Sequence, residues 1–302
     1  MNAARVALVT GATGFVGGRL ARRLLADGWE THAIVRPSSN ATILRSVVGS
    51  GSVHVHDGST VGLVDIVRSV HPDIVFHLAS VFVAEHRTDD VDPLIRSNVL
   101  FGVQLLEAMT VAGVSDIVNT GSYSQHYEGR EYSPVSLYAA TKQAFQDILQ
   151  FYCEVRGLRA VTLELPDTYG PNDRRPKLLS LLDRAARTGE TLQMSPGEQL
   201  LDLLHVDDVV HGYGVAADGL LSGHLPSPSQ YQLSSGSLVR LKDVVELYRQ
   251  ATGHTVSVAW GGRPYRVREV MEPRSPVPLL PGWAPSRSLA VWLAESTAAT
   301  AK

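Results

Sequence analysis

Apolar runs and amphipathic segments alternate along the first 165 residues of the chain. Residues 5–10 form a largely apolar run, which predicts a buried parallel strand. After three closely spaced glycines, Leu20, Leu24 and Leu25 fall on one face of a helix. The same succession then repeats, with strands expected at 31–37, 52–57, 73–80, 116–122 and 159–165, and helices at 61–70, 92–112 and 138–156. This alternation predicts a parallel sheet with helices on both of its faces.

The pattern changes near residue 166, where prolines, short helices and loops replace the alternation. Residues 200–213 are expected to form a strand that leads into a helix, and this helix would return to the first domain. The predicted fold class is therefore α/β, a Rossmann-type doubly wound parallel sheet with a smaller, interleaved C-terminal lobe. The first domain would comprise residues 1–165 with the return segment 200–220, and the lobe would comprise residues 166–199 and 221–302.

Composition and charge narrow the choice of partners. The chain of 302 residues, 44% of them hydrophobic, can fill a sizeable core, and its net charge of -3 argues against nucleic acid or an anionic membrane surface. The N-terminal segment leaves no room for a signal peptide and no apolar run is long enough to span a membrane, so we expect a cytoplasmic protein. Cys153 is the single cysteine, which excludes an internal disulfide, and the scattered histidines do not suggest a metal site.

The three glycines follow the first strand directly, in "TGATGFVGG" at residues 10–18. A strand that leads straight into a helix exposes backbone N–H groups at the positive end of the helix dipole, which suits a diphosphate. Gly11 would allow the tight turn, Gly14 would let the phosphate approach, and Gly17 would let the helix pack against the sheet. This spacing predicts a dinucleotide site, although a tight turn without a ligand would use the same glycines.

The end of the second strand indicates which dinucleotide would bind. An acidic residue there would bind the ribose of NAD, whereas an arginine can bind the additional phosphate of NADP. Arg36 occupies this position and Ser38 lies just beyond it, so NADPH is favoured over NADH. Asp57, after the third strand, could accept a hydrogen bond from the adenine amino group or cap the following turn.

Tyr138 and Lys142 lie four residues apart on the predicted helix 138–156, so their side chains share one face. Because an ammonium close to a phenol stabilises the phenolate, we expect Lys142 to lower the pKa of Tyr138 and make it a usable proton donor and acceptor. Such a pair is common on surface helices and by itself does not indicate catalysis. Here a glycine turn and a strand that ends in Ser122 precede the pair, and this combination favours a catalytic role.

These motifs together resemble the extended short-chain dehydrogenase/reductases over nearly the whole chain. The other matching segments are "HLAS" at 77–80, "SNVLFGVQLLEA" at 97–108, "DTYGPND" at 167–173 and "LLHVDDVV" at 203–210. Within that family, "NTGSYSQHY" at 119–127 and "LPGWAPSRSL" at 280–289 are most similar to the NDP-hexose C4-ketoreductases of the CDP-abequose synthase type.

The resemblance implies a catalytic triad of Ser122, Tyr138 and Lys142, in which Ser122 orients the substrate oxygen. The loop after Ser122 is one residue longer than in many members, so Ser124 is an alternative. Expected cofactor contacts are Gly11, Thr13, Gly14, Phe15, Val16, Gly17, Arg36, Ser38, Asp57, Gly58, Leu78, Ala79, Ser80, Asn98, Tyr138, Lys142 and Leu165. Expected substrate contacts are Ser122, Ser124, Asp167, Lys177 and Arg263.

Other implications of the resemblance concern architecture. His205 and Asp207 would belong to a structural element at the junction of the two lobes. A homodimer would form through a four-helix interface that uses the helices at 92–112 and 138–156.

Local chemistry separates the three activities that share this scaffold. A 4,6-dehydratase needs a further acid and base, which such relatives carry directly after the serine or threonine, whereas this chain has Tyr123, Ser124 and Gln125 there. A 4-epimerase usually has the acidic NAD determinant, and this chain has Arg36 instead. We therefore expect NADPH-dependent reduction of the 4-keto group of a nucleotide-diphosphate-linked (6-deoxy) hexose, with Tyr138 as the proton donor. A 4-epimerase and a 4,6-dehydratase remain alternatives.

Two further alternatives leave the sugar chemistry altogether. The protein could be an NADP-binding sensor without catalysis, against which Tyr138 and Lys142 argue. It could also reduce a non-sugar carbonyl, but the basic and polar segments at 171–177 and 261–269 favour a charged ligand over an apolar one.

Overall fold

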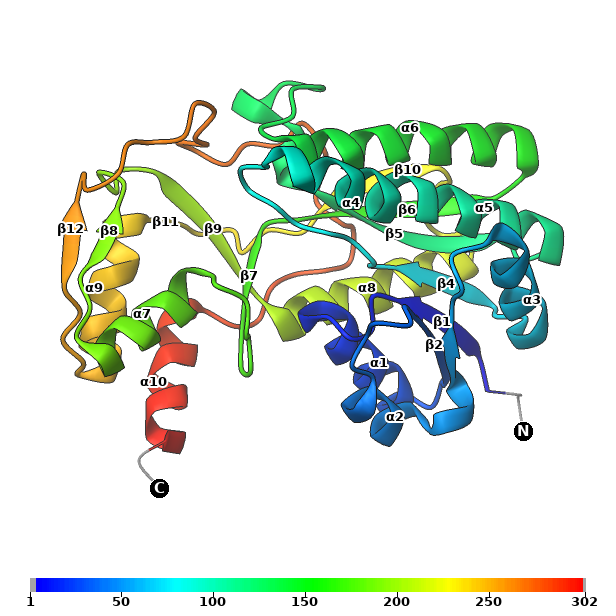
Figure 1. The fold of residues 1–302 in the computed structure, drawn as a ribbon, viewed down its shortest axis with the longest axis horizontal. Helices are drawn as coiled ribbons and strands as arrows, with labels where there is room; N and C mark the ends of the chain where they lie inside the picture. The colour runs from blue at the N-terminus through cyan, green and yellow to red at the C-terminus, as the bar shows by residue number, and fades with distance from the viewer. Residues whose placement is uncertain (1–3, 301–302) are drawn as a thin grey trace.

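Seven parallel strands form the central sheet of the structure, a computed structural model that describes residues 4–300 (Figure 1). They are β1 (Val6–Thr10), β2 (Glu30–Val35), β3 (Val53–Val55), β4 (Ile74–His77), β5 (Asp116–Ser122), β6 (Arg159–Leu165) and β10 (Ser229–Gln232). Their order is β10-β6-β5-β4-β1-β2-β3, so the direction of winding reverses between β1 and β4. The predicted doubly wound parallel sheet is confirmed. Sheets of this kind bind ligands at the carboxyl ends of the strands where the order reverses.

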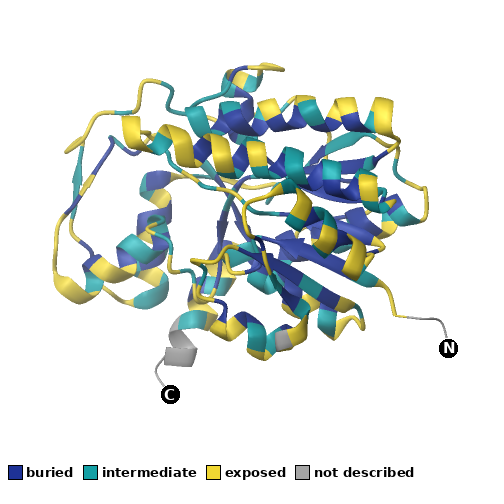
Figure 2. Ribbon diagram, turned by 45° about the vertical axis from the view of Figure 1, so that its right-hand side comes forward, coloured by how far each residue is buried: buried dark blue, intermediate teal, exposed yellow. Residues whose placement is uncertain are grey.

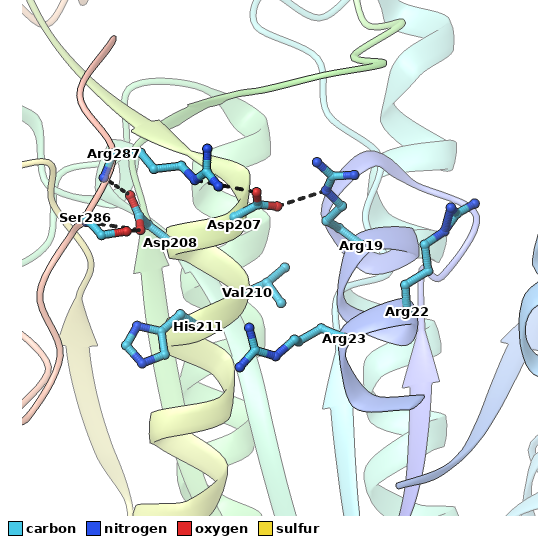
Figure 3. A pocket seen from close by; sticks show the side chains of 9 residues that line it. All are labelled: Arg19, Arg22, Arg23, Asp207, Asp208, Val210, His211, Ser286 and Arg287. Carbon is cyan, nitrogen blue, oxygen red and sulfur yellow. Dashed lines mark hydrogen bonds and ion pairs between the residues drawn. The ribbon is translucent and has the colours of Figure 1, made fainter. Parts of the chain in front are cut away.

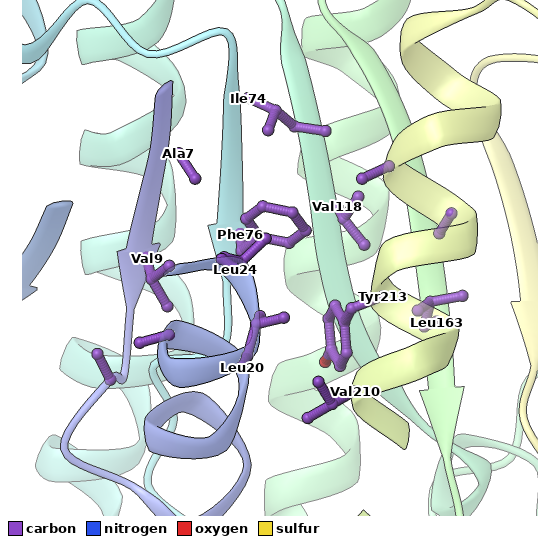
Figure 4. Close-up of a cluster of buried hydrophobic side chains, with 14 of the residues drawn as sticks. Ala7, Val9, Leu20, Leu24, Ile74, Phe76, Val118, Leu163, Val210 and Tyr213 are labelled. Carbon is purple, nitrogen blue, oxygen red and sulfur yellow. The ribbon is translucent and has the colours of Figure 1, made fainter. Parts of the chain in front are cut away.

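Helices cover both faces of this sheet. On one face lie α1 (Phe15–Ala26), α2 (Thr42–Val48) and α8 (Val206–Leu221), and on the other α3 (Thr60–Val70), α5 (Phe101–Ala112) and α6 (Leu137–Arg156). The core of the first face joins Leu20 and Leu24 of α1, Phe76 of β4 and Tyr213 of α8 (Figure 4). The buried residues form the strands and the inward helix faces, while the exposed ones line the outer surface (Figure 2). The helix α8 packs on this sheet against β5 and β6.

The helix expected at 92–112 has an irregular centre. It begins as α4 (Val91–Ile95), continues through a π-helical turn over Arg96–Leu100, and ends as α5. A π-helical turn shifts the side chains that follow it and is common at functional sites. Hydrophobic periodicity gave no sign of this turn, because a π-helical turn changes the backbone hydrogen bonds and leaves no mark of its own in the residue pattern.

The edge strand β10 was not expected in the central sheet. It pairs with β6 in parallel, yet its residues fall within the range 221–302 that the sequence analysis assigned to the smaller lobe. The prediction missed it because Ser229, Gln230 and Gln232 give the strand a polar sequence, without the apolar run typical of a buried parallel strand.

The remaining residues form a smaller layer of short strands and helices around a separate core. Its strands are β7 (Asp167–Tyr169), β8 (Leu192–Met194), β9 (Leu200–His205), β11 (Leu238–Arg240) and β12 (Val258–Trp260). Its helices are α7 (Leu178–Thr188), α9 (Leu241–Thr252) and α10 (Leu289–Thr300). Leu182, Leu203, Val244 and Tyr248 pack together in this core. In Figure 1 these elements lie to one side of the central sheet, and β7 and β9 cross between the two parts.

Within the described part of the chain, one helical stretch, Thr88–Ala112, is long and apolar enough to cross a membrane, which corrects the expectation that no apolar run has this length. Its residues Leu94, Leu105, Leu106 and Met109 are fully buried inside the protein. The length and apolar composition of this stretch therefore fit a helix that packs against the central sheet.

Candidate functional site

The glycine turn lies at the carboxyl end of β1, where the sheet order reverses. Gly11 has φ +72°, a left-handed conformation that favours glycine, and a Cβ there would lie 2.7 Å from the backbone nitrogen of Ala79. A Cβ on Gly17 would lie 2.3 Å from the oxygen of Gly11. Gly17 therefore lets the start of α1 lie directly against the turn that follows β1. Its expected contact with the cofactor remains a prediction.

The first turn of α1 keeps its backbone donors available. Gly14 is the N-cap and, within α1, neither a side-chain cap nor an acidic residue satisfies the first N–H groups. A Cβ on Gly14 would lie only 3.1 Å from the oxygen of Gly11, so a side chain would crowd the turn. The predicted residues Thr13, Phe15 and Val16 surround this turn and are not fully buried. These features fit the diphosphate of a dinucleotide.

The residues expected to bind the adenosine part lie at the carboxyl ends of β2 and β3. Arg36 and Ser38 are exposed directly after β2. Among the described residues, no ion pair engages the guanidinium of Arg36. The Asp57 carboxylate accepts hydrogen bonds at 2.8 Å from both the backbone N–H and the hydroxyl of Ser59. Of the two roles considered for Asp57, the structure therefore shows the turn cap. Contacts with adenine by Asp57 and Gly58 remain predictions.

Asn98 supports the site from within the protein. It is buried in the π-helical turn, and its amide group donates to the backbone oxygen of Val81 and the hydroxyl of Thr141 at 3.0 and 2.9 Å. Its side-chain oxygen accepts the N–H of Val81 at 2.8 Å and the hydroxyl of Ser80 at 3.2 Å. Asn98 thereby ties the loop after β4 to α6. The expected direct contact between Asn98 and the cofactor remains a prediction.

The three residues of the expected triad converge beyond the carboxyl end of β5. Ser122 ends β5, and Tyr138 and Lys142 lie on the first turns of α6. The Lys142 ammonium donates to the backbone oxygen of Thr120 at 2.9 Å. The Tyr138 phenol forms hydrogen bonds with Ser80 and Ser122, and these bonds favour the ionised form of the phenol. Ser124 is next to Ser122, and their hydroxyl oxygens are 2.8 Å apart.

The pKa values in the triad differ from the expectation. Burial raises the pKa of Tyr138 to about 12, although the hydrogen bonds with Ser80 and Ser122 act in the opposite direction. Burial lowers the pKa of Lys142 to about 8. The predicted lowering of the Tyr138 pKa by Lys142 is thus wrong for the protein by itself, because desolvation of the phenol outweighs its hydrogen bonds with Ser80 and Ser122, and the charge of Asp167 raises the pKa further. With a pKa of about 8, the Lys142 ammonium can release and regain a proton near neutral pH. This property suits a residue that takes part in proton transfer.

A second group of residues faces Tyr138 from the smaller lobe. Lys177 Nζ lies 2.9 Å from Asp167 Oδ1 and 4.3 Å from the centre of the Phe82 ring. Phe82 in turn packs edge-on against Tyr138, with the ring centres 4.9 Å apart. The hydroxyl of Tyr123 donates to Asp167 at 3.4 Å. Two of the expected substrate residues, Asp167 and Lys177, therefore lie together next to the triad.

Arg263 does not join this group in the described structure. It is exposed beyond β12, and its backbone N–H bonds to Met194 of β8, at the far edge of the lobe. Arg266 and Glu269 from the same segment lie close enough to Tyr123 to influence its pKa, which Asp167 and burial raise well above the ordinary value. The sequence analysis missed Phe82, Tyr123 and Arg266 as neighbours of the site. Only the position of Tyr123 directly after Ser122 could have suggested one of them.

A groove of about 560 Å³ between α1, α8 and the C-terminal segment has a different character (Figure 3). Asp207 lies 3.0 Å from Arg19 and 3.7 Å from Arg287, so one carboxylate joins two segments. Asp208 accepts the backbone N–H of Arg287 at 3.0 Å. His205 caps α8 by accepting the N–H of Asp207 at 3.2 Å. These contacts agree with the structural role expected for His205 and Asp207, and they pair the guanidinium groups of Arg19 and Arg287 with one carboxylate.

Comparison with known proteins places this geometry in a family. The family model described as "NAD dependent epimerase/dehydratase family" matches residues 7–224. The chain is 25% identical over 290 residues to CDP-abequose synthase of Salmonella muenchen, which covers 93% of each chain. It is 31% identical over 235 residues to UDP-glucose 4-epimerase of Mycolicibacterium smegmatis, covering 72% of this chain and 74% of the relative.

Among solved structures, MoeE5 in complex with UDP-glucose and NAD superposes with a TM-score of 0.80 at 28% identity, covering 98% of this chain and 99% of MoeE5. The chain therefore belongs to the NAD dependent epimerase/dehydratase family, whose enzymes bind a nicotinamide dinucleotide and modify nucleotide sugars.

Proposed function

We propose that the protein reduces the 4-keto group of a nucleotide-diphosphate-linked 6-deoxyhexose with NADPH. The observation that carries this proposal is the convergence of Ser122, Tyr138 and Lys142 at the end of β5, on the same edge of the sheet as the glycine turn after β1. A phenol next to a serine hydroxyl, with a buried ammonium on the same helix face, can protonate the oxygen of a carbonyl group as that group is reduced. The relation to CDP-abequose synthase supports a sugar nucleotide as substrate.

The roles of the residues follow from their positions. A nicotinamide dinucleotide, held by the glycine turn and the residues after β2, β3 and β4, supplies the hydride when it is bound. Tyr138 would give its proton to the oxygen that develops negative charge, while Ser122 donates a hydrogen bond to the same oxygen. Lys142, bonded to Thr120, would hold a positive charge near the phenol and favour loss of its proton.

The preference for NADPH rests on Arg36. A guanidinium at the end of β2 can pair with a phosphate on the adenosine ribose, whereas an acidic residue there would repel it. MoeE5 is described with NAD, so cofactor preference is a property to be measured for each member. Arg36→Ala should weaken binding of NADPH about tenfold and leave NADH binding within about twofold, because one charge-assisted contact is lost. Equal losses for both cofactors would show that Arg36 does not select between them.

We also propose that the protein is a homodimer through α4, α5 and α6. These neighbouring helices expose apolar side chains that a partner would cover. They are Val91, Ile95, Leu100, Val111, Phe151 and Val155, each at least 42% exposed.

The proposal is tested by supplying CDP-linked and dTDP-linked 4-keto-6-deoxyglucose together with NADPH and following the absorbance of the reduced nicotinamide. Consumption of NADPH that depends on one of these sugars is expected. A second candidate is 4-epimerisation, which the 31% identity to UDP-glucose 4-epimerase favours. Conversion of UDP-glucose to UDP-galactose with catalytic NAD, without net consumption of cofactor, would establish that activity instead. Cofactor binding without either reaction would favour a sensor.

A further inference from the structure

Behind Ser122 lies a buried pair of ionisable residues that the proposed chemistry does not use. The side chains of His126 and Glu164 are 4% and 0% exposed, and His126 Nε2 lies 2.7 Å from Glu164 Oε1. Removing an imidazole and a carboxylate from water costs free energy that a hydrophobic pair would not cost.

The hydrogen bonds of His126 define its protonation. Nδ1 lies 3.1 Å from the backbone oxygen of Arg130, and since a carbonyl oxygen can only accept, Nδ1 carries a proton. Nε2 faces the carboxylate of Glu164, which also accepts. Burial by itself lowers the pKa of His126, but the hydrogen bond and charge of Glu164, with the backbone oxygens of Arg130 and Glu131, outweigh it and raise the pKa. Both ring nitrogens therefore face oxygen atoms that can accept, an arrangement that an imidazolium satisfies by donating from both.

The pair is built into the strands that carry the site. Glu164 of β6 lies opposite Gly121 of β5, and Gly121 immediately precedes Ser122. A Cβ on Gly121 would lie 3.1 Å from Cγ of Glu164 and 3.2 Å from Oε1 of Gln125. Glycine at this position leaves the space in which Glu164 reaches His126. The second carboxylate oxygen of Glu164 accepts the hydroxyl of Ser275 at 3.2 Å, so the C-terminal segment is held as well.

The other end of the pair closes the turn that begins at Ser122. The backbone N–H of His126 donates to the oxygen of Tyr123 at 3.1 Å. Gln125 Oε1 accepts the backbone N–H of Ser122 at 2.9 Å, and the N–H of Ser124 donates to the Ser122 hydroxyl at 3.3 Å. The orientation of the Ser122 side chain is therefore set by a turn whose last residue is anchored through His126.

We propose that Glu164 and His126 are positioning residues, which together fix the turn at 122–126 so that the Ser122 hydroxyl faces Tyr138. The inference rests on the proposed function, in which Ser122 orients the carbonyl oxygen of the substrate. The pair of His126 and Glu164 would contribute to the geometry of the reacting groups and not to cofactor binding, because neither side chain lies at the glycine turn.

The test compares Glu164→Gln with Asp116→Asn, the same change of carboxylate to amide at the other end of β5. Asp116 is also buried and lies 2.6 Å from Arg159. Because misplaced reacting groups cost about two orders of magnitude in rate, Glu164→Gln should lower kcat between about tenfold and a hundredfold while the KM for NADPH stays within about twofold. Asp116→Asn should leave kcat unchanged. His126→Gln, which retains an N–H donor, should keep more activity than His126→Ala. Unchanged kcat in Glu164→Gln, or equal losses in Glu164→Gln and Asp116→Asn, would overturn the proposal.

A second measurement does not depend on the substrate. In protein with ¹⁵N-labelled histidine, with His126 assigned by its disappearance in His126→Gln, both of its ring nitrogens should be protonated at neutral pH. In Glu164→Gln the ring should become neutral, and amide exchange at 122–126 should accelerate relative to Asp116→Asn. A neutral His126 in the unaltered protein, or unchanged exchange, would refute the positioning role. If no sugar nucleotide is turned over, the proposed function fails, and these spectra still decide the role of the pair.

Discussion

At the scale of single residues, Tyr138 is the group on which the proposed reaction depends most. Its phenol lies among Ser80, Ser122 and the ring of Phe82, so the protein partly desolvates it while offering it hydrogen bonds. Burial raises its pKa to about 12, which keeps it protonated at neutral pH and makes it a proton donor in the direction of reduction. The pKa that matters in turnover is that of the complex with cofactor and substrate.

Tyr138→Phe should reduce kcat by a factor of about 10² to 10⁴, the usual contribution of a general acid, because the phenyl ring keeps the shape but not the proton. The Kd for NADPH should change by less than about threefold, since the rest of the cofactor site is untouched. Single-turnover reduction and fluorescence titration of NADPH measure the two quantities. Turnover close to that of the unaltered protein would remove Tyr138 from the mechanism.

At the scale of elements, the glycine turn and α1 act as one unit. Gly17 lies in the first turns of α1, and its missing side chain allows the helix to begin directly over Gly11. The turn, the exposed N–H groups and the loop after β4 are therefore fixed together. Strain at one glycine is expected to reach the whole phosphate site.

Gly17→Ala should weaken NADPH binding at least about tenfold and destabilise the protein by about 1–3 kcal/mol, because the added methyl group would meet the Gly11 oxygen at 2.3 Å. Gly214→Ala in α8 is the matched control, since a Cβ there meets no atom within 4 Å and alanine favours a helix. That control should be neutral or stabilising by up to about 1 kcal/mol. Chemical denaturation and a binding titration measure both variants, and equal behaviour of the two would contradict the role of Gly17.

At the scale of the whole molecule, the apolar surface of α4, α5 and α6 predicts association. Phe151→Glu should convert a dimer into a monomer of 32.6 kDa, because a buried carboxylate without a partner opposes the interface. Ile43→Glu on α2, an apolar position that is also at least half exposed but lies on the opposite face of the sheet, should leave the dimer intact. Sedimentation equilibrium distinguishes the two states. A monomeric unaltered protein would rule out the interface.

Stability should fall in mild acid because of His77. This residue is buried at the end of β4, bonded to Thr10 at 2.9 Å, and burial lowers its pKa to about 3. The unfolded chain binds a proton near pH 6.5, so between about pH 6.5 and 3 it holds one proton more than the folded chain at this position. The stability provided by neutral His77 is present above pH 6.5 and is lost at about 1.4 kcal/mol per pH unit as the pH falls.

Urea denaturation from pH 8 to pH 4 measures this slope. His77→Asn, which cannot take up that proton, should show a slope smaller by about 1.4 kcal/mol per pH unit. An identical slope in both proteins would mean that other groups account for acid sensitivity.

The sequence by itself determined the alternation of strands and helices, and with it the parallel sheet, the glycine turn and the helix that carries Tyr138 and Lys142. These features are local, because periodicity and spacing of four residues are properties of a short segment. Tertiary structure alone decided the rest. The polar strand β10 entered the sheet through pairing with β6, Asn98 became a bridge between the β4 loop and α6, and Arg263 came to lie at the far edge of the lobe. The pKa of Tyr138 and the buried pair of His126 and Glu164 depend in the same way on residues distant in sequence, since desolvation and hydrogen bonding arise only when the chain has packed.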